Sequence, residues 1–210
     1  GGKPLPLDPR EIEDIVTSVA ELKLKHLVVT SVTRDDLPDG GAHHWATLIR
    51  RMHQEIPSVT MEVLIPDMQG REELLDIILA EHPDVISHNM ETVRRLTPEV
   101  RRVADYDRSL RVLQYLRSKG AVTKSGIMLG LGETREEILQ TMDDLRAVDC
   151  QVMTIGQYLQ PSKEHYPVQA YIHPDVFDEY RLIGLEKGFR HMESAPMVRS
   201  SYHAEKHVHK

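Results

Sequence analysis

The residues with the most distinctive chemistry lie late in the sequence, where residues 199–204 read Arg-Ser-Ser-Tyr-His-Ala. Neither helix nor strand propensity favours a guanidinium, two hydroxyls, a phenol and an imidazole in succession. Serine favours helix caps and turns, so the simplest interpretation of Ser200 and Ser201 is a polar, capped tail. Two other segments, 30–41 and 156–161, are equally polar and equally unusual. The three segments together favour a functional site.

The segment 30–41 combines hydroxyl groups with an arginine and three aspartates. Hydroxyls and carboxylates accept hydrogen bonds from an ammonium group, so Thr30, Ser31 and Asp35 suit a cationic or zwitterionic ligand. The alternative is a solvated turn around the sequence Pro-Asp-Gly-Gly at 38–41. Both interpretations stay open on this segment alone.

Two further polar segments follow apolar runs. Asn89 and Glu91 come after the run at 84–89 and are suited to bond ribose hydroxyls, although Asn89 is equally suited to cap a helix. The glycines of 126–133 allow a flat ligand such as adenine to approach the backbone closely. This segment lacks the Gly-Lys-Ser/Thr ending of a nucleotide phosphate loop.

Histidine and cysteine give weaker signals, with twelve histidines and one cysteine in the chain. His43 and His44 are adjacent, so a helix directs them about 100° apart and they cannot share a metal ion as i, i+4 partners would. His207 and His209 are interpreted as solvated tail residues. Cys150 is interpreted as a small buried apolar side chain, and a single cysteine excludes an internal disulfide. No Gly-x-Ser-x-Gly elbow of a serine hydrolase occurs.

Apolar runs alternate with amphipathic patterns, and this alternation places the polar segments at strand ends. The predicted strands are 26–32, 60–65, 84–89, 122–131 and 152–159. The predicted helices are 8–23, 42–54, 72–81, 91–97, 107–119, 134–148 and 174–188. Thr134 and Glu137 match a capping box. This order predicts an α/β fold with a parallel sheet, right-handed crossovers and ligands at the carboxyl ends of the strands.

The first predicted helix has no strand before it, so we expect a βα series whose first strand is missing from this chain. Restoring that strand gives six βα units, fewer than the eight of a closed barrel. Two regions are predicted: the βα array at 1–188, and a C-terminal extension at 189–210 with little periodicity that carries the Arg-Ser-Ser-Tyr-His-Ala motif.

Composition excludes several classes of protein. The 210 residues suffice for one domain, and 40% hydrophobic with 28% charged residues is ordinary for a soluble protein. The net charge of −7 argues against non-specific binding of nucleic acid, which needs a basic face. No apolar run approaches the roughly 20 residues that a membrane span requires.

Six stretches of the sequence, in the same order, resemble the lipoyl synthase family of radical S-adenosylmethionine (SAM) enzymes. They are 30–41, 62–70, 88–93, 123–134, 154–162 and 198–204. The resemblance covers nearly the whole chain and implies a partial (βα)6 TIM-like barrel of the radical SAM type. It also implies a cytoplasmic enzyme that inserts two sulfur atoms, at C6 and C8, into an octanoyl group. That group is attached to a lipoyl carrier domain or to the glycine cleavage H protein.

The same resemblance implies three cofactors. One 4Fe-4S cluster, held by a Cys-x3-Cys-x2-Cys loop, cleaves SAM to a 5′-deoxyadenosyl radical with an electron from a donor such as ferredoxin or flavodoxin. A second 4Fe-4S cluster is consumed as the sulfur donor. Thiolates suit such clusters, and one open iron is left to chelate SAM.

The resemblance also assigns a role to each unusual segment. Ser201, with Ser200 as the alternative, is expected to be the hydroxyl ligand of the sulfur-donating cluster, with Arg199 close to it. The expected SAM contacts are Thr30, Ser31 and Asp35 for the methionyl part, Asn89 and Glu91 for the ribose, the segment 126–133 with Gly130 and Glu133 for the adenine, and Arg108 and Lys124 for the carboxylate. The expected substrate contacts are Gln157, Tyr158 and Gln160.

The family's cysteines are the one departure. Both cysteine triads of the family lie on its N-terminal side, and Gly2-Lys3-Pro4-Leu5-Pro6 resembles the stretch directly after the radical SAM triad. We therefore expect a fragment that begins after the triad, binds neither cluster and is inactive. One alternative is a non-catalytic barrel that binds a lipoyl carrier domain or SAM. Another is a metal-independent enzyme that uses Asp35, Asp36 and His88 as acid and base.

Overall fold

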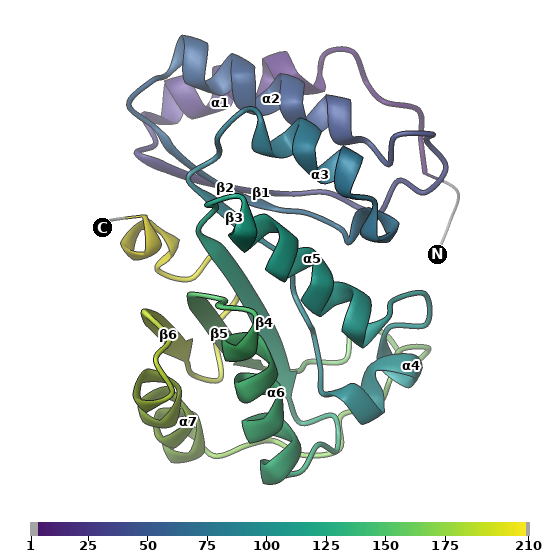
Figure 1. Cartoon of the computed structure of the whole chain (residues 1–210), viewed down its shortest axis with the longest axis vertical. Helices are drawn as coiled ribbons and strands as arrows, with labels where there is room; N and C mark the ends of the chain where they lie inside the picture. The colour runs from purple at the N-terminus through teal and green to yellow at the C-terminus, as the bar shows by residue number, and fades with distance from the viewer. Residues whose placement is uncertain (1–3, 209–210) are drawn as a thin grey trace.

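The computed structural model describes residues 4–208, and its central feature is one sheet of six parallel strands (Figure 1). The strands are β1 (His26–Thr30), β2 (Thr60–Leu64), β3 (Val85–Ser87), β4 (Thr123–Leu129), β5 (Val152–Gln157) and β6 (His191–Ser194). Their order in the sheet is their order in the chain, from β1 at one edge to β6 at the other. The predicted α/β fold with a parallel sheet is confirmed.

Helices connect the strands, as right-handed parallel crossovers require. They are α1 (Glu11–Leu22), α2 (Ala42–Glu55), α3 (Glu72–Leu79), α4 (Thr97–Val100), α5 (Tyr106–Ser118), α6 (Arg135–Ala147) and α7 (Pro174–Glu186), with short 3-10 helices η1 (Met68–Gly70), η2 (Arg94–Leu96) and η3 (Ala204–His207). The predicted capping box begins α6: Thr134 Oγ1 accepts from the Glu137 amide, and the Glu137 carboxylate accepts from the Thr134 amide. The predicted helix at 91–97 is replaced by η2 and α4.

The two faces of the sheet differ in chemistry, because successive side chains of a strand point to opposite sides. On one face Met61 and Val63 belong to a core cluster with α1, α2 and α3. Further along the same face, Met153 and Ile155 belong to a second cluster with α6 and α7. The residues that alternate with these along the strands point to the other face. Several of them are polar, namely Glu62, Ser87, Lys124, Thr154 and His191. The sheet therefore has an apolar face under the helices and a largely polar inner face.

The sixth strand, β6, lies inside the predicted C-terminal extension and was not expected. It has four residues, two of them charged or titratable, so it gives no apolar run that sequence patterns could detect. Its partner is β5, with Val152 aligned to His191 and Ile155 aligned to Ser194. Five strands were predicted and six are present among residues 4–208, so the extension is continuous with the sheet.

The chain after β6 turns back across the inner face of the sheet. Ala195 donates its amide to Ile155 O, and Gln157 donates its amide to Pro196 O, so this return begins against β5. The segment ends in η3, which contacts β1 at the opposite edge of the sheet. Figure 1 shows this short C-terminal helix close to β1 and β2, and its His207 ring also lies 5.6 Å, between centroids, from the His191 ring of β6. Residues 195–207 thus connect the two edges of the open sheet.

A few expectations fall outside the described residues, namely those on Gly2, Lys3 and His209. Within residues 4–208, no helix combines the length and the apolar character needed to cross a membrane.

Candidate functional site

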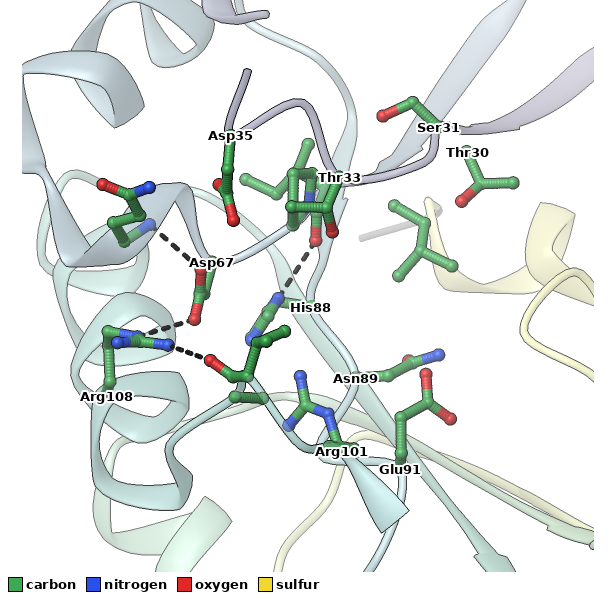
Figure 2. A pocket seen from close by; sticks show the side chains of 16 residues that line it. Thr30, Ser31, Thr33, Asp35, Asp67, His88, Asn89, Glu91, Arg101 and Arg108 are labelled. Carbon is green, nitrogen blue, oxygen red and sulfur yellow. Dashed lines mark hydrogen bonds and ion pairs between the residues drawn. The ribbon is translucent and has the colours of Figure 1, made fainter. Parts of the chain in front are cut away.

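Two neighbouring cavities lie along the carboxyl ends and the inner face of the strands. The larger, of about 450 Å³, lies beyond β1, β2 and β3 (Figure 2). Its polar lining consists of Thr30, Ser31, Thr33, Asp35, Asp67, Gln69, His88, Asn89, Glu91, Arg101 and Arg108. The structure therefore brings together the residues predicted to contact the methionyl part and the ribose of SAM, together with Arg108.

The smaller cavity, of about 90 Å³, shares Asn89 and Glu91 with the larger one. Its other walls are Gly126, Ile127 and Met128 of β4, Thr154 and Gly156 of β5, and Val198, Arg199 and Ser200. The first part of the predicted adenine segment and the Arg-Ser-Ser motif thus meet on either side of one space. Residues more than 100 positions apart in the sequence become neighbours through the return of the chain across the inner face.

Glu91 is fixed at the boundary between the two cavities by β4. Its amide donates to Gly126 O and its carbonyl accepts from the Met128 amide, while its φ of 64° lies in the left-handed region. A non-glycine residue keeps such a backbone only where the surroundings impose it, which is typical of functional sites. Burial raises the pKa of the Glu91 carboxyl, against the hydrogen bond from Asn89 and the charge of Arg101.

Asn89 presents an unsatisfied oxygen at the same place. Its Oδ1 is buried and has no hydrogen-bond partner among the described residues. Asn89 therefore does not cap a helix, which was the alternative interpretation of this residue. Buried polar atoms are nearly always hydrogen-bonded in native proteins, so an unpaired amide oxygen in a cavity wall is suited to a ligand donor such as a hydroxyl.

Two arginines line the larger cavity, Arg101 directly after α4 and Arg108 within α5. Arg108 Nε donates to Asp67 Oδ2 at 2.6 Å, and its Nη2 donates to Val103 O. Arg101 Nη1 donates to Met90 O at 3.2 Å and to Ser109 Oγ at 3.3 Å. Burial lowers the pKa of Arg101, yet an arginine stays protonated at neutral pH, so its charge faces the cavity.

Sequence reasoning missed Arg101 and Asp67. Arg101 lies next to Arg102 in a short polar connection, where arginine is ordinary. Asp67 follows the end of β2 just as Asn89 follows the end of β3, and that position was the available signal.

His88 is buried beside these charges with both ring nitrogens occupied. Nδ1 lies 3.0 Å from Ile65 O, and because a carbonyl only accepts, Nδ1 carries the proton. Nε2 then accepts from Ser109 Oγ at 2.9 Å. Burial lowers the pKa of His88 to about 4. A neutral imidazole with no free nitrogen is a structural support of the cavity, and this geometry does not favour His88 as an acid or base.

Lys124 lies away from the larger cavity, although it was expected at the SAM carboxylate. Its ammonium is fully buried on the inner face and donates to Glu62 Oε2 at 2.9 Å and to Ser200 O. His207 Nδ1 is 3.3 Å from the same ammonium. His207 is completely buried, so its interpretation as a solvated tail residue is wrong. Opposite charges in two apolar strands, β2 and β4, which are separated only by β3, were the signal for this pair.

The remaining predicted residues lie around a different loop. Glu133 accepts from the amides of Gly130 and Leu131, which closes the turn after β4. Gln157 holds the segment 158–173 through bonds to Tyr158 O and Ala170 O and from the Ile172 amide. Tyr158 and Gln160 bond to carbonyls of the same segment. None of these five residues lines the two cavities described above.

The residues of the motif itself differ in exposure. Arg199 and Ser201 are exposed, and Ser200 is half-buried. Arg199 Nη1 donates to Val198 O at 2.7 Å, so its guanidinium turns back toward the segment that carries it.

Comparison with known proteins identifies the family. The chain matches the radical SAM superfamily over residues 1–145. It is 62% identical to a lipoyl synthase of Treponema denticola over 207 residues, which are 99% of this chain and 71% of that protein. It is 58% identical to a lipoyl synthase of Bacteroides thetaiotaomicron, covering 99% of this chain and 73% of that protein.

The chain belongs to the lipoyl synthase family of the radical SAM superfamily.

Solved structures support the fold of this lipoyl synthase family member. A maturase of the [FeFe]-hydrogenase matches 99% of this chain and 48% of its own, with a TM-score of 0.70 at 14% identity. Methylornithine synthase matches 95% of this chain and 66% of its own, with a TM-score of 0.66 at 12% identity. Identities this low show the fold alone, and that fold is the predicted partial barrel of the radical SAM type.

The lipoyl synthase family uses SAM, and the two cavities fit it. Asn89 Oδ1 is an unpaired acceptor, and Thr30, Ser31 and Asp35 supply acceptors for an ammonium group. A β carbon on Gly126 would lie 2.4 Å from Thr154 Oγ1, so only glycine leaves the inner face open beside Asn89. These features suit a ligand with an amine, a ribose and a flat base.

The iron–sulfur clusters of the lipoyl synthase family do not fit the residues present. The chain has one cysteine, and Cys150 is completely buried, with Sγ against Thr123 O and Val152 O. Burial raises the pKa of its thiol to about 12, which disfavours the thiolate that iron requires. Among residues 4–208, no group of three histidine, cysteine or acidic side chains is arranged to hold a metal ion.

Proposed function

We propose that this chain forms the SAM-binding body of a lipoyl synthase, whose reaction inserts two sulfur atoms at C6 and C8 of a protein-bound octanoyl group. The carrying observation is that Asn89 and Glu91 share one cavity with Arg199 and Ser200. The family assignment supports the reaction, and the placement of these side chains supports the site.

The proposed roles of the residues follow from their positions. Thr30, Ser31 and Asp35 accept hydrogen bonds from the ammonium of the methionyl part, and Arg108 attracts its carboxylate. Asn89 Oδ1 and the Glu91 carboxyl accept from the ribose hydroxyls. The inner face at Gly126 leaves room for the adenine. When bound, SAM and the iron–sulfur clusters supply the radical and the sulfur; the residues named here bind and orient.

Lys124, Gly130 and Glu133 take supporting roles in this proposal, because their polar groups are engaged within the chain. Gln157, Tyr158 and Gln160 shape the substrate end through the segment 158–173, which they hold. Arg199 and Ser201 stay our candidates for direct participation. Ser201, with Ser200 as the alternative, is the proposed hydroxyl ligand of the second cluster, and these serines do not complete a cluster site by themselves.

The 210 residues alone are proposed to be inactive, since one buried cysteine cannot supply the ligands of two clusters. The proposed substrate is an octanoylated lipoyl carrier domain or the glycine cleavage H protein. The proposed electron donor is a ferredoxin or a flavodoxin, and the proposed compartment is the cytoplasm.

The experiment that tests the site is an NMR titration of the ¹⁵N-labelled chain with S-adenosylhomocysteine, which suits weak binding. We expect shifts for the amides of 30–35, 88–91 and 126–128. Glu91→Gln and Asn89→Ala should weaken binding about tenfold, since each removes one acceptor for a ribose hydroxyl. Gln160→Ala, in the exposed segment, is the matched control and should bind as the unaltered chain does. Shifts confined to other surfaces would refute the proposed site.

A further inference from the structure

The segment 198–207 lies on the inner face of the sheet. It packs so closely against β5 that only a glycine fits at position 156 of this strand. A β carbon on Gly156 would stand 2.3 Å from Val198 O and 3.4 Å from Arg199 Nη1. Any other side chain at this position would displace the backbone of the segment. Gly156 therefore marks the place where the segment first meets the sheet.

A buried ionic group holds the same segment at two further points. Lys124 Nζ donates to Ser200 O near the start of the segment, and it lies 3.3 Å from His207 Nδ1 near its end. Both side chains of the Lys124–Glu62 pair are fully buried. The segment is thus attached to β4 at two residues that lie seven positions apart.

Glu62 completes the attachment from β2. It accepts from Lys124 at 2.9 Å and from Ser87 Oγ, and so connects to β2 the ammonium that lies beside His207. Burial by itself would raise the pKa of Glu62, but the charge of Lys124 and the hydrogen bonds to the carboxylate outweigh burial and lower it. The carboxylate is therefore charged at neutral pH and pairs with Lys124, whose ammonium reaches both Ser200 O and His207 Nδ1.

Stability alone does not account for this group. A buried ion pair costs desolvation, and well-packed apolar residues of similar volume are often as stable or more so. What such a pair provides is one defined arrangement, because its partners must all be present at the correct distances. Here the partners belong to β2, β4 and the segment 198–207.

We infer that Lys124, Glu62 and His207 are positioning residues, which fix the segment 198–207 on the inner face and so hold Arg199 and Ser200 against Asn89 and Glu91. The inference rests on the proposed function, because it assigns these three side chains to the wall of the proposed SAM site. Their effect on a ligand is indirect: they touch the segment, and the segment forms the wall.

The test compares His207→Leu with Lys206→Ala in the complete chain. His207→Leu keeps the buried volume and leaves the Lys124–Glu62 pair intact, whereas Lys206 is an exposed neighbour in η3. The first measurement is amide hydrogen exchange at Tyr202, Ala204 and Lys206, which donate backbone bonds within the segment. We expect exchange to accelerate about tenfold or more in His207→Leu, with no change in β4 and β5.

The second measurement is the affinity of both variants for S-adenosylhomocysteine by NMR titration. We expect His207→Leu to bind about fivefold to tenfold more weakly and Lys206→Ala to bind normally. Faster exchange with unchanged affinity would overturn the positioning role, because a released segment would then leave the site intact. Unchanged exchange would overturn the attachment itself.

Gly156→Ala provides an independent route to the same state, since it displaces the segment without altering any charge. It should reproduce both effects of His207→Leu. If the unaltered chain does not bind the nucleoside at all, the proposed function fails, and the inference fails with it. If the unaltered chain binds the nucleoside, and His207→Leu and Gly156→Ala bind it as tightly as the unaltered chain does, only the inference fails.

Discussion

His88 shows how a single buried side chain makes the cavity sensitive to pH. The Ile65 carbonyl and the Ser109 hydroxyl fix one neutral tautomer, and burial lowers its pKa to about 4 from an ordinary value of 6.5. Protonation is therefore easier in the unfolded chain than in the folded one. The contribution of neutral His88 to stability is complete above pH 6.5 and is lost as the pH falls through about 4.

We expect the free energy of unfolding to fall by about 1.4 kcal/mol per pH unit across this window through His88 alone. The measurement is urea unfolding at intervals from pH 7.5 to about 4. His88→Gln keeps hydrogen-bonding groups but does not titrate, so its curve should be flatter by that slope. Parallel curves for the two proteins would show that His88 does not titrate on unfolding.

Cys150 should be chemically silent in the native protein. Its thiol is buried between Thr123 O and Val152 O, and its pKa is raised to about 12. We expect a thiol reagent at pH 8 to label the folded chain only as fast as the chain opens, and to label the urea-unfolded chain at once. Labelling of the folded chain at the rate of the unfolded one would place the thiol at the surface.

At the scale of elements, the segment 158–173 depends on one side chain of β5. Gln157 donates to Tyr158 O and Ala170 O and accepts from the Ile172 amide, so one amide group satisfies three backbone groups. Gly130 lies against this arrangement, because a β carbon there would meet Ala170 O at 2.3 Å and Gln157 Nε2 at 2.4 Å. The segment therefore depends on Gln157 for its conformation.

Gln157→Ala should release the segment, so that its backbone opens more readily to trypsin at the exposed Lys163. We expect cleavage after Lys163 to accelerate about tenfold, because the local opening loses three hydrogen bonds while β5 stays paired. Gln160→Ala is the matched control, since Gln160 is exposed and makes a single bond to His165 O. Equal cleavage in the two variants would show that the segment is held by other contacts.

The elements also show what the sequence could predict and what it could not. Apolar periodicity located β1 to β5 and most helices, because those strands bury a face against helices. It failed for β6, whose four residues alternate between half-buried and buried and include His191 and Glu193. It also failed for His207, because a polar residue in an irregular tail gives no signal of burial. The place of Asn89 and Glu91 in the cavity wall was predictable, because the ends of parallel strands meet at one edge of the sheet. The place of Arg101 was not predictable, because this residue lies in the connection between α4 and α5.

At the scale of the whole molecule, two core clusters meet at β3 and β4. Those strands share two aligned pairs, Ile86–Thr123 and Ser87–Lys124, whereas β4 and β5 share six. Helix α5 joins the clusters, with Leu113 in one and Val112 in the other. The Lys124–Glu62 pair spans the same boundary from the inner face.

The whole chain is also the scale at which cluster binding is decided. We expect anaerobic reconstitution with iron and sulfide to leave the 210 residues without a stable 4Fe-4S cluster, because their one cysteine is buried. The measurement is iron and sulfide bound per chain after desalting. The lipoyl synthase of Treponema denticola, treated in parallel, is the positive control. One stable cluster per chain in these residues would contradict the prediction.

The order of the strands has a consequence for synthesis on the ribosome. Because each strand pairs with the one made just before it, the sheet can grow by one edge as the chain emerges. The segment 198–207 follows all six strands in the chain, so the inner face stays uncovered until the six strands have been synthesised. That face carries Glu62, Lys124 and Thr154, while the apolar face receives a helix with each crossover. In a partly synthesised chain, the face of the sheet that is exposed to solvent is therefore the largely polar one. The nascent sheet then has little exposed apolar surface through which to aggregate.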